Sequence, residues 1–266
     1  MKNIIFPKKT TQRYWDIHYK YVLNIFESCG LNVILQEKPG LEENSNNPTL
    51  EFKVCIDGKW VEFDYSDNGE TWNKSRVPLF KFHFKPHHKK LKNIYPFLPV
   101  CFYDWNDLNL NIQYKAIGNT VLNCQKPYAG ALARRNALRE ILKDYPVDYS
   151  ITDQHTYWKK VNNCLVSVHV PGQNNNMLDR AQLQLMAFGC CTISPKLPEI
   201  LPFNKSLIPN IHYIQCNDDY SDLTDKIDWC MENREKCIEI GNNVKDLFRS
   251  YFKPEKLIEY MEEIIK

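Results

Sequence analysis

The chain has 266 residues, of which 43% are apolar and 25% charged, and its formal net charge is +2. This length is enough to bury one large core or two smaller ones, and the small net charge does not indicate a polyanionic partner for the chain as a whole. The opening MKNIIFPKK is too short an apolar run for a signal peptide, and no later segment approaches the ~20 apolar residues of a membrane span.

The ten cysteines are spread through apolar segments without a C-x-x-C pair. In a chain of this length such cysteines are typical of reduced, buried thiols rather than of a disulfide scaffold. We therefore expect a reducing, cytosol-like (cytoplasmic) location. Peripheral association with the cytosolic face of a membrane, through a basic surface, remains an alternative.

The first part of the chain, residues 1–112, predicts one α/β domain. Its apolar patterning indicates a helix from Thr11 to about Cys29. Asp57-Gly58 is a favoured two-residue hairpin turn between two strand-like runs. The predicted strands cover residues 3–6, 32–36, 50–56, 60–66 and 79–84, and the turn-rich stretch 38–49 predicts a loop.

A basic stretch lies in the second half of this domain. No acidic residue occurs between Glu70 and Asp104, while seven cationic residues do. They would form a local basic surface, and they are Lys74, Arg76, Lys81, Lys85, Lys89, Lys90 and Lys92.

The second part, residues 113–252, alternates strands with helices. The predicted strands cover residues 120–124, 164–170, 192–195 and 211–215, and the predicted helices cover 132–143, 178–188, 221–233 and 235–251. This alternation favours a parallel sheet with helices on both faces. Residues 253–266 predict a last helix that opens at Pro254. Two α/β domains with a cleft between them are the simplest architecture.

A strand-loop-helix-strand unit within residues 164–194 carries the first candidate site. Its polar loop follows the carboxyl end of a strand, where open α/β sheets bind ligands, and Arg180 stands at the opening of the next helix. A helix N-terminus suits a diphosphate. Gly172, Asn174 and Asn175 are candidates for close contact with that ligand. The alternative is a turn glycine, a simple polar loop and a solvated arginine.

A second candidate cluster follows the strand at 120–124, where a loop containing Gly130 leads into a helix with Arg134 and Arg135. The guanidinium group can donate two parallel hydrogen bonds to a diphosphate, and Arg135 is the preferred ligand. The alternative for Arg134 and Arg139 is a position on the helix surface.

The first domain offers candidates for a catalytic base. Asp64 and Asp67 lie at a strand end, and either carboxylate could remove a proton from a hydroxyl group. The alternative for both is a carboxylate that caps a turn. Asp16 and His18 are weaker candidates. Lys81 alternates with two phenylalanines, so its ammonium points away from their rings, toward the cleft and a ligand bound there or simply toward solvent.

Metal binding is not expected. The segment HFKPHH has three histidines but no cysteine or carboxylate at ligand spacing, and no D-x-D follows a strand. We therefore expect no metal ligands, and helix dipoles with cationic side chains would neutralise the charge of a bound diphosphate.

The order of motifs over about residues 120–250 resembles that of GT-B-fold glycosyltransferases, closest in pattern to exostosin-like and lipopolysaccharide-modifying transferases. In those families a strand ending in Pro-Gly precedes a polar loop, an Arg, an acidic residue and a helix closing in Ala-x-Gly-Cys. The counterparts here are Pro171, Gly172, Arg180, Gln184 and residues 187–190. The resemblance implies two Rossmann-like domains facing a cleft, with the last helix crossing back to the first domain. It also implies an Arg near the donor diphosphate, for which Arg135 fits.

One departure concerns Gln184, which stands where related retaining enzymes have a Glu that accepts hydrogen bonds from the ribose hydroxyls. A Gln carbonyl still accepts, but the charge-assisted component is lost. Donor binding tolerates this change better than a retaining mechanism does, so retention and inversion both stay open.

The predicted function is metal-independent transfer of a sugar from a UDP- or GDP-sugar to a hydroxyl acceptor such as a glycan, a lipid-linked glycan or a protein glycan, in glycan biosynthesis. No cofactor beyond that co-substrate is expected. The alternatives are a nucleic-acid-binding protein that uses the basic stretch 74–92, an inactive nucleotide-sugar-binding relative, and a Rossmann-type dehydrogenase. The last lacks the G-x-G-x-x-G motif, and nucleic acid is not the expected partner because the rest of the chain is not basic.

Overall fold

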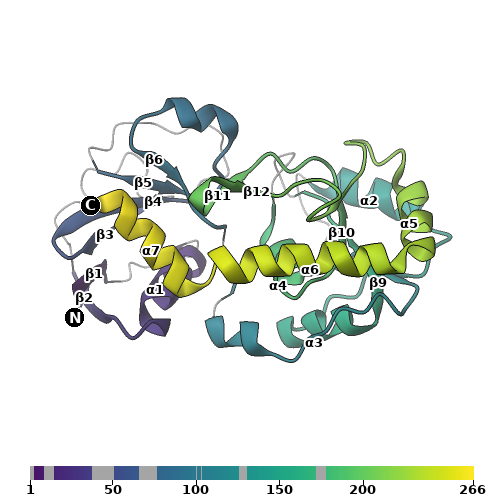
Figure 1. Ribbon diagram of the computed structural model, residues 1–266, viewed down its shortest axis with the longest axis horizontal. Helices are drawn as coiled ribbons and strands as arrows, with labels where there is room; N and C mark the ends of the chain where they lie inside the picture. The colour runs from purple at the N-terminus through teal and green to yellow at the C-terminus, as the bar shows by residue number, and fades with distance from the viewer. Residues whose placement is uncertain are drawn as a thin grey trace. The chain divides into compact units, whose positions relative to one another are not determined.

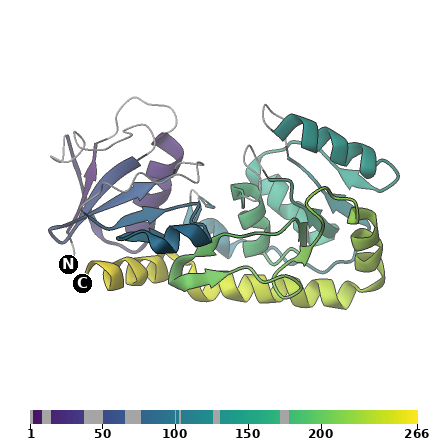
Figure 2. The same cartoon turned by 90° about the horizontal axis from the view of Figure 1, so that it is seen from above.

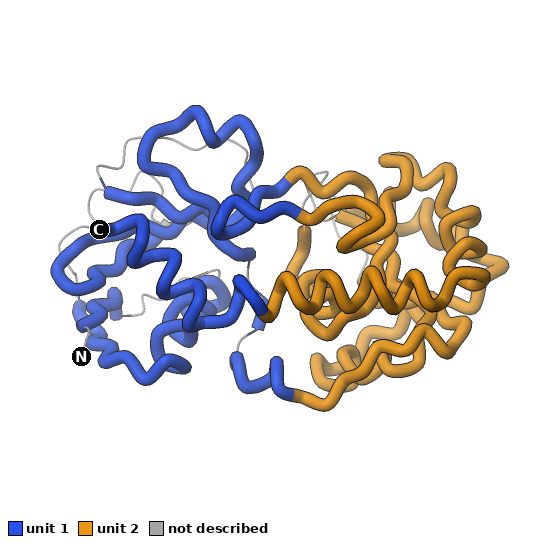
Figure 3. The backbone as a smooth tube through the Cα atoms, viewed as in Figure 1, with its two compact units in different colours: residues 1–109, 199–206, 250–266 blue, residues 110–198, 207–249 orange. Residues whose placement is uncertain are grey.

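The computed structural model (Figure 1) describes residues 3–8, 15–37, 51–65, 77–99, 101–102, 104–125, 131–171 and 178–266. The chain divides into two compact units (Figure 3). Unit 1 comprises Met1–Asn109, Glu199–Ser206 and Ser250–Lys266, and unit 2 comprises Leu110–Pro198 and Leu207–Arg249. Both are α/β structures, as the sequence predicts. Of the candidates above, Asp67, Gly172, Asn174 and Asn175 lie outside the described residues.

Unit 1 is built on a mixed sheet with the strand order β2-β1-β3-β4-β5-β6. Strands β4, β5 and β6 run parallel to one another. The Asp57-Gly58 turn joins β3 to β4 with φ angles of 49° and 82°, which confirms the predicted hairpin. The strands are β1 (Asn3–Pro7), β2 (Asn32–Gln36), β3 (Glu51–Ile56), β4 (Lys59–Asp64), β5 (Leu79–Lys81) and β6 (Ile94–Pro96).

Helices α1 (Trp15–Ser28) and α7 (Pro254–Ile265) pack against each other within unit 1. Apolar side chains at helical spacing on α7 are buried, and the ring of Tyr260 lies 6.1 Å from that of Phe80 in β5. Residues 199–206 form a segment that returns to unit 1, and the ring centroid of its Phe203 lies 4.9 Å from that of Tyr260. The last helix therefore completes the core of the unit in which the chain begins, as predicted. The returning segment contains β11 (Ile200–Leu201), η6 (Pro202–Asn204) and β12 (Lys205–Ser206).

Unit 2 is built on a parallel sheet with the strand order β13-β10-β9-β7-β8. After β7 the chain passes to β8 on one side, then returns to β9 on the other side of β7. The direction of winding therefore reverses between β7 and β9. The strands are β7 (Thr120–Leu122), β8 (Val147–Asp148), β9 (Cys164–Val168), β10 (Thr192–Ser194) and β13 (Ile214–Gln215).

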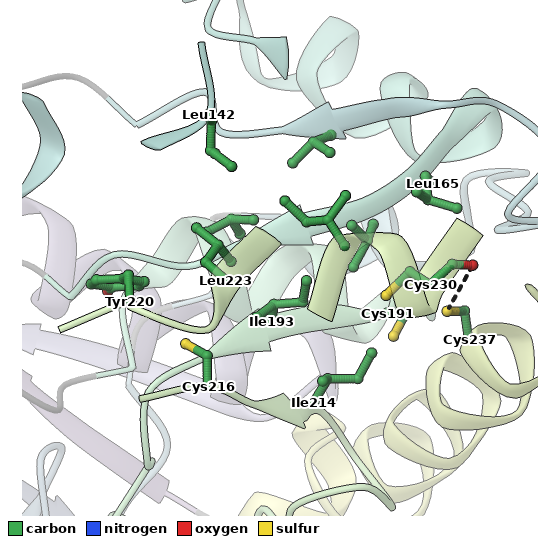
Figure 4. Close-up of a cluster of buried hydrophobic side chains, with 14 of the residues drawn as sticks. Leu142, Leu165, Cys191, Ile193, Ile214, Cys216, Tyr220, Leu223, Cys230 and Cys237 are labelled. Atoms are coloured by element: carbon green, nitrogen blue, oxygen red, sulfur yellow. Dashed lines mark hydrogen bonds between the residues drawn. The ribbon is translucent and has the colours of Figure 1, made fainter. Parts of the chain in front are cut away.

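Helices cover the sheet of unit 2 (Figure 1, Figure 2). A single apolar cluster joins Val166 and Val168 of β9 to side chains of α2, α5 and α6 (Figure 4). The hydroxyl of Ser167 instead accepts a hydrogen bond from Gln182 in α4. Since side chains alternate along a strand, α4 covers the opposite face. The helices are α2 (Leu132–Ile141), α3 (Gln154–Lys159), α4 (Arg180–Ala187), α5 (Leu223–Glu232) and α6 (Arg234–Tyr251).

The structure adds short elements that the sequence patterns do not predict. Strand β5 ends at Lys81 rather than continuing to residue 84, and two 3-10 turns, η2 (Pro86–Lys90) and η3 (Trp105–Asn109), follow in unit 1. Helix α3 and a further turn, η5 (Lys160–Asn163), precede β9. Helix α3 is only 6 residues long, too short for a clear apolar period.

All ten cysteines are free thiols, and eight of them are buried, as the sequence predicts. Within the described part of the chain, no helix combines the length and apolar character that a membrane crossing requires.

Candidate functional site

The carboxyl ends of β7 and β9 form the point in unit 2 at which the order of strands reverses. In open α/β sheets this position is the usual place of a ligand, because the loops after the two strands diverge there. The described residues at this edge are strongly polar. They include Asn123 and Gln125 after β7, His169 after β9, and Asp179 at the N-cap of α4.

The carboxylate of Asp179 is the centre of a hydrogen-bonded network at this edge. Its Oδ1 accepts from the backbone N–H of Gln182 at 3.0 Å, which caps α4. Its Oδ2 accepts from Gln125 Nε2 and lies 3.6 Å from His169 Nε2 and 3.8 Å from Arg135 Nη2. Burial would raise the pKa of this carboxyl, but His169, the Gln182 N–H and Arg135 together lower the pKa below its ordinary value.

Arg134 and Arg135 tie the first turn of α2 to the end of β9. Arg135 Nη2 donates to the carbonyl oxygen of Val170 at 3.3 Å, and Arg134 Nη2 donates to that of Pro171 at 3.0 Å. The openings of α2 and α4 thus meet around the end of β9, which is the arrangement a shared diphosphate site requires. Arg135 is 4% exposed, however, and its guanidinium contacts Val170 O and Asp179 Oδ2. Its role as a phosphate ligand stays a prediction.

A cavity of about 300 Å³ lies beside this network, between the residues after β7, α3 and the first turns of α4. It is lined by Cys124, Ile151, Thr152, Gln154, Tyr157, Arg180, Ala181 and Gln184. Two predicted donor-binding residues, Arg180 and Gln184, therefore reach the same cavity. They stand four positions apart on α4, a spacing that places them on one face of a helix.

Electrostatics in this cavity favour an anionic, partly apolar ligand. Removal from water lowers the pKa of the Arg180 guanidinium from its usual value, yet an arginine remains charged at neutral pH. Burial raises the pKa of Tyr157 well above its usual value, so its hydroxyl stays neutral. The side-chain carbonyl oxygen of Gln184 accepts a hydrogen bond of 3.1 Å from Trp158 Nε1, which holds the carboxamide at the cavity wall.

Asp64 and Lys81, the candidates from the first domain, lie side by side in unit 1. The parallel register of β4 and β5 pairs these two positions, and Lys81 Nζ lies 2.9 Å from Asp64 Oδ2. Both side chains are buried, with 2% of Asp64 and none of Lys81 exposed. The sequence argument treated them separately and did not predict this ion pair. Their roles as base and donor ligand stay predictions, while the structure gives them a role in the core.

Of the weaker candidates, His18 stacks on Tyr65 with ring centroids 4.2 Å apart, and the side chain of Asp16 lies outside what the structure describes. No group of three or more His, Cys, Asp or Glu among the described residues is arranged to hold a metal ion. Metal-independent chemistry stays a prediction.

Sequence reasoning missed several polar residues at the strand ends. Asn123 is buried, donates 3.0 Å to Val168 O, and its side-chain oxygen has no hydrogen-bond partner within the described ranges. Gln125 after β7 and His169 after β9 were also missed. The usable signal was a polar residue within three positions after an apolar strand, which marks the ligand edge of a parallel sheet.

The chain folds into two α/β units, each built on its own sheet. Two solved structures show this fold across almost the whole chain. A glycosyltransferase from Rickettsia africae ESF-5 has a TM-score of 0.52 at 11% identity and covers 98% of this chain and 96% of its own. The DNA modifying enzyme beta-glucosyltransferase, whose substrate is uridine diphosphoglucose, has a TM-score of 0.54 at 11% identity and covers 98% of both chains.

Sequence comparisons are less informative. No family model matches the chain. An uncharacterized protein, 179R of Invertebrate iridescent virus 6, is 34% identical over 87 residues, which cover 30% of this chain and 7% of that protein. The match to this curated relative therefore spans less than a tenth of the relative's length.

Proposed function

We propose that the protein is a glycosyltransferase that moves a sugar from a nucleotide-sugar donor to a hydroxyl acceptor. One observation carries this proposal: the cavity that Arg180 and Gln184 line, at the carboxyl edge of the unit 2 sheet, in a fold shared with glycosyltransferases over 98% of the chain. The donor is a UDP- or GDP-sugar, and no other cofactor takes part. The acceptor is a glycan or another hydroxyl compound.

The residues that line the cavity suit two parts of the donor, the nucleoside and the diphosphate, at separate places. Ile151, Tyr157 and the polar groups of Thr152 and Gln154 suit a nucleoside, which is partly apolar and rich in hydrogen-bonding atoms. The N-terminus of α4 and Arg180 suit the diphosphate. The Asp179 carboxylate caps that helix and holds Gln125 and Arg135 in place without itself contacting the phosphate.

In the transfer, the acceptor oxygen forms a bond to the anomeric carbon while the bond from that carbon to the diphosphate oxygen breaks. The acceptor proton passes to a base, and the negative charge on the leaving diphosphate increases. A cation held next to the developing charge stabilises the transition state more than the ground state. Arg180 is the residue to which we assign this role.

The test is release of free nucleotide from a panel of nucleotide sugars, with and without hydroxyl acceptors, alongside thermal-shift measurements with nucleoside diphosphates. Arg180→Ala should reduce kcat/KM for the best donor about 30- to 1,000-fold, equivalent to ~2–4 kcal/mol. Lys143→Ala, at an exposed cation of the same unit outside the cavity, is the matched control and should leave turnover unchanged.

Two outcomes would contradict the proposal. Nucleotide binding without turnover of any donor would identify an inactive sugar-nucleotide-binding relative, an alternative that Gln184 makes relevant. Equal turnover by wild type, Arg180→Ala and Lys143→Ala would place the donor elsewhere. A ligand that binds only the folded protein raises its apparent stability, so a flat thermal-shift response to all nucleotides would also count against the site.

A second candidate function, nucleic-acid binding, is favoured by the basic turn η2 of unit 1. Lys89 and Lys90 of this turn and Lys92 just after it are exposed, and no acidic residue occurs in residues 77–99. Buried His88 accepts a hydrogen bond of 2.9 Å from the backbone N–H of Lys85, which fixes the turn. The structural neighbour named above modifies DNA, so nucleic acid enters here as a candidate acceptor as well as a candidate ligand.

The test of this second candidate is the salt dependence of binding to a labelled DNA duplex. Engagement of three or four lysines predicts a slope of log affinity against log salt of about −3 to −4. Lys89→Glu combined with Lys90→Glu should weaken binding and flatten that slope, whereas Lys236→Glu at an exposed lysine of α6 should not. Binding that is absent at low salt would exclude this function without touching the donor assay.

A further inference from the structure

We propose that unit 2 contains a second ligand site, for an acidic sugar such as a uronic acid residue of a glycan. The site is a cavity of about 240 Å³, and its lining residues are Asn111, Gln113, Lys115, Ile117, Asn162 and Asn163. Residues 111–117 precede β7 and residues 162–163 precede β9. The cavity thus lies at the amino ends of these strands, at the opposite edge of the sheet from the candidate donor cavity.

The backbone that shapes this cavity is held rigidly. A Cβ atom on Gly118 would lie 1.8 Å from the carbonyl oxygen of Asn163, so only glycine allows the two segments to approach this closely. Arg234 donates hydrogen bonds to the carbonyl oxygens of Ala116 and Gly118 and to the side-chain oxygen of Asn119. Buried Ala116 has a φ of 49°, a strained conformation that these contacts maintain. The cavity is therefore preorganised for a ligand.

Four side-chain carboxamides supply most of the polar atoms of the cavity. The hydrogen bonds among them determine which donors and acceptors remain available to a ligand. The Asn162 side-chain oxygen accepts from the backbone N–H of Gln113 at 2.8 Å, and the Asn111 side-chain oxygen accepts from Gln113 Nε2 at 3.2 Å. Within the described ranges, the NH₂ groups of Asn111 and Asn162 and the whole carboxamide of Asn163 have no other hydrogen-bond partner. The remaining groups are mainly donors.

Lys115 gives the cavity a single positive charge, and the lining contains no carboxylate. A cavity with more hydrogen-bond donors than acceptors and with one cation favours a ligand that is rich in acceptor oxygens and carries a negative charge. Ile117 is 63% exposed and offers an apolar surface to the C–H groups of a sugar ring. Hydroxyl groups, which both donate and accept, also match carboxamides, so a sugar that bears a carboxylate uses every group present.

The size of the cavity limits the ligand to about one sugar ring, because sites for drug-sized ligands begin at ~300 Å³. Inorganic phosphate would use Lys115 but would leave Ile117 and most of the carboxamides without contact. The inference does not depend on the proposed transfer. If the protein is a glycosyltransferase, the site would hold an acidic glycan apart from the donor cavity.

The test is saturation-transfer difference NMR of the full chain with glucuronic acid, glucose and inorganic phosphate, each with and without excess UDP. Wild type should bind glucuronic acid more tightly than glucose, and UDP should not displace it. Lys115→Met should weaken glucuronic acid binding about tenfold and leave glucose unchanged, because it removes one charge-assisted hydrogen bond. Lys143→Met, at an exposed lysine outside the cavity, is the control and should bind as wild type does.

Three results would overturn the proposal. They are equal binding of glucose and glucuronic acid, binding of phosphate alone, and displacement of glucuronic acid by UDP. The last result would mean that the sugar acid occupies the donor cavity. Asn163→Asp gives an independent check, since a carboxylate in the cavity should abolish glucuronic acid binding while circular dichroism and the melting temperature remain those of the wild type.

Discussion

Asp64 and Lys81 illustrate how a buried charge at one position depends on its partner at another. Their side chains are almost fully buried in unit 1, with Lys81 Nζ 2.9 Å from Asp64 Oδ2. A buried pair adds little net stability over an apolar pair of the same size, because both charges must leave water. Loss of one partner is costly, because the other buried charge then loses this ion pair.

Asp64→Ala should therefore lower the free energy of unfolding by ~3–5 kcal/mol. The double variant Asp64→Leu with Lys81→Met removes both charges and should recover most of that loss. Urea unfolding, followed by circular dichroism, measures both. If Asp64 instead serves only as the catalytic base, Asp64→Ala would abolish transfer while its unfolding midpoint stays at the wild-type value.

Asp179 is a charged residue whose environment stabilises the ionised form. Because its pKa is lowered in the folded protein, the ionised carboxylate contributes stability above the unfolded-state pKa of about 3.9. That contribution is lost as the pH falls through the lower, folded-state pKa. Asp179→Asn removes the charge and keeps a side chain that can cap α4.

The expected result is that wild type is more stable than Asp179→Asn at neutral pH and that the difference shrinks below about pH 5. Unfolding free energies measured by urea titration at a series of pH values test this. A difference that is independent of pH would show that the hydrogen bonds of this side chain, and not its charge, provide the stability.

At the scale of elements, α4 and α6 approach each other through two glycines. Gly189, which follows the C-cap residue of α4, has a φ of 84°, and its carbonyl oxygen would lie 2.0 Å from a Cβ atom on Gly241 of α6. The turn after α4 thus touches the backbone of a helix about fifty positions later. This contact sets the position of α4, whose first turns carry Arg180 and Gln184.

Gly241→Ala should destabilise the protein by ~1–3 kcal/mol, because the added methyl group overpacks the contact with backbone atoms. The sign of this stability change tests the contact, because a Gly to Ala substitution in a helix interior ordinarily stabilises a protein by about 0.5–1 kcal/mol. Asn242→Ala, at the next and exposed position of α6, should be neutral or stabilising. Thermal unfolding of the two variants, with nucleotide binding as a second readout, compares these outcomes.

At the scale of the whole molecule, unit 1 is assembled from three separate parts of the sequence. The first 109 residues are completed by residues 199–206 and 250–266. The backbone N–H of Ile200 donates to Phe84 O at 2.9 Å, and Leu257, Tyr260 and Met261 of α7 are buried in this unit. Neither half of the chain, cut near residue 112, contains the complete core of unit 1.

A fragment of residues 1–112 should therefore lack a cooperative thermal transition and bind dyes specific for exposed apolar surface. The same fragment joined through a flexible linker to residues 250–266 should recover a cooperative transition, because α7 then covers α1. Circular dichroism melting curves compare the two fragments. Cooperative unfolding of the shorter fragment at the same temperature as the longer one would contradict this prediction.

The sequence by itself determined the elements with a strong local signal, and it predicted the edge of the sheet at which we expect a ligand. The Asp57-Gly58 turn, the Asp179 cap and the apolar period of α4 depend on neighbours within a few positions, and each could be recognised without the fold. The order of these elements predicted two α/β domains, and the expectation of a GT-B fold came from the resemblance in motifs over about residues 120–250.

Only the tertiary structure decided which partners the polar residues have. The register of β4 and β5 pairs Asp64 with Lys81, and the return of β9 beside β7 brings Gln125 and Arg135 to Asp179. Short elements such as α3, which forms part of the cavity wall, also depend on that packing. Contacts between residues far apart in the chain leave no local pattern, because they arise only when separate strands align.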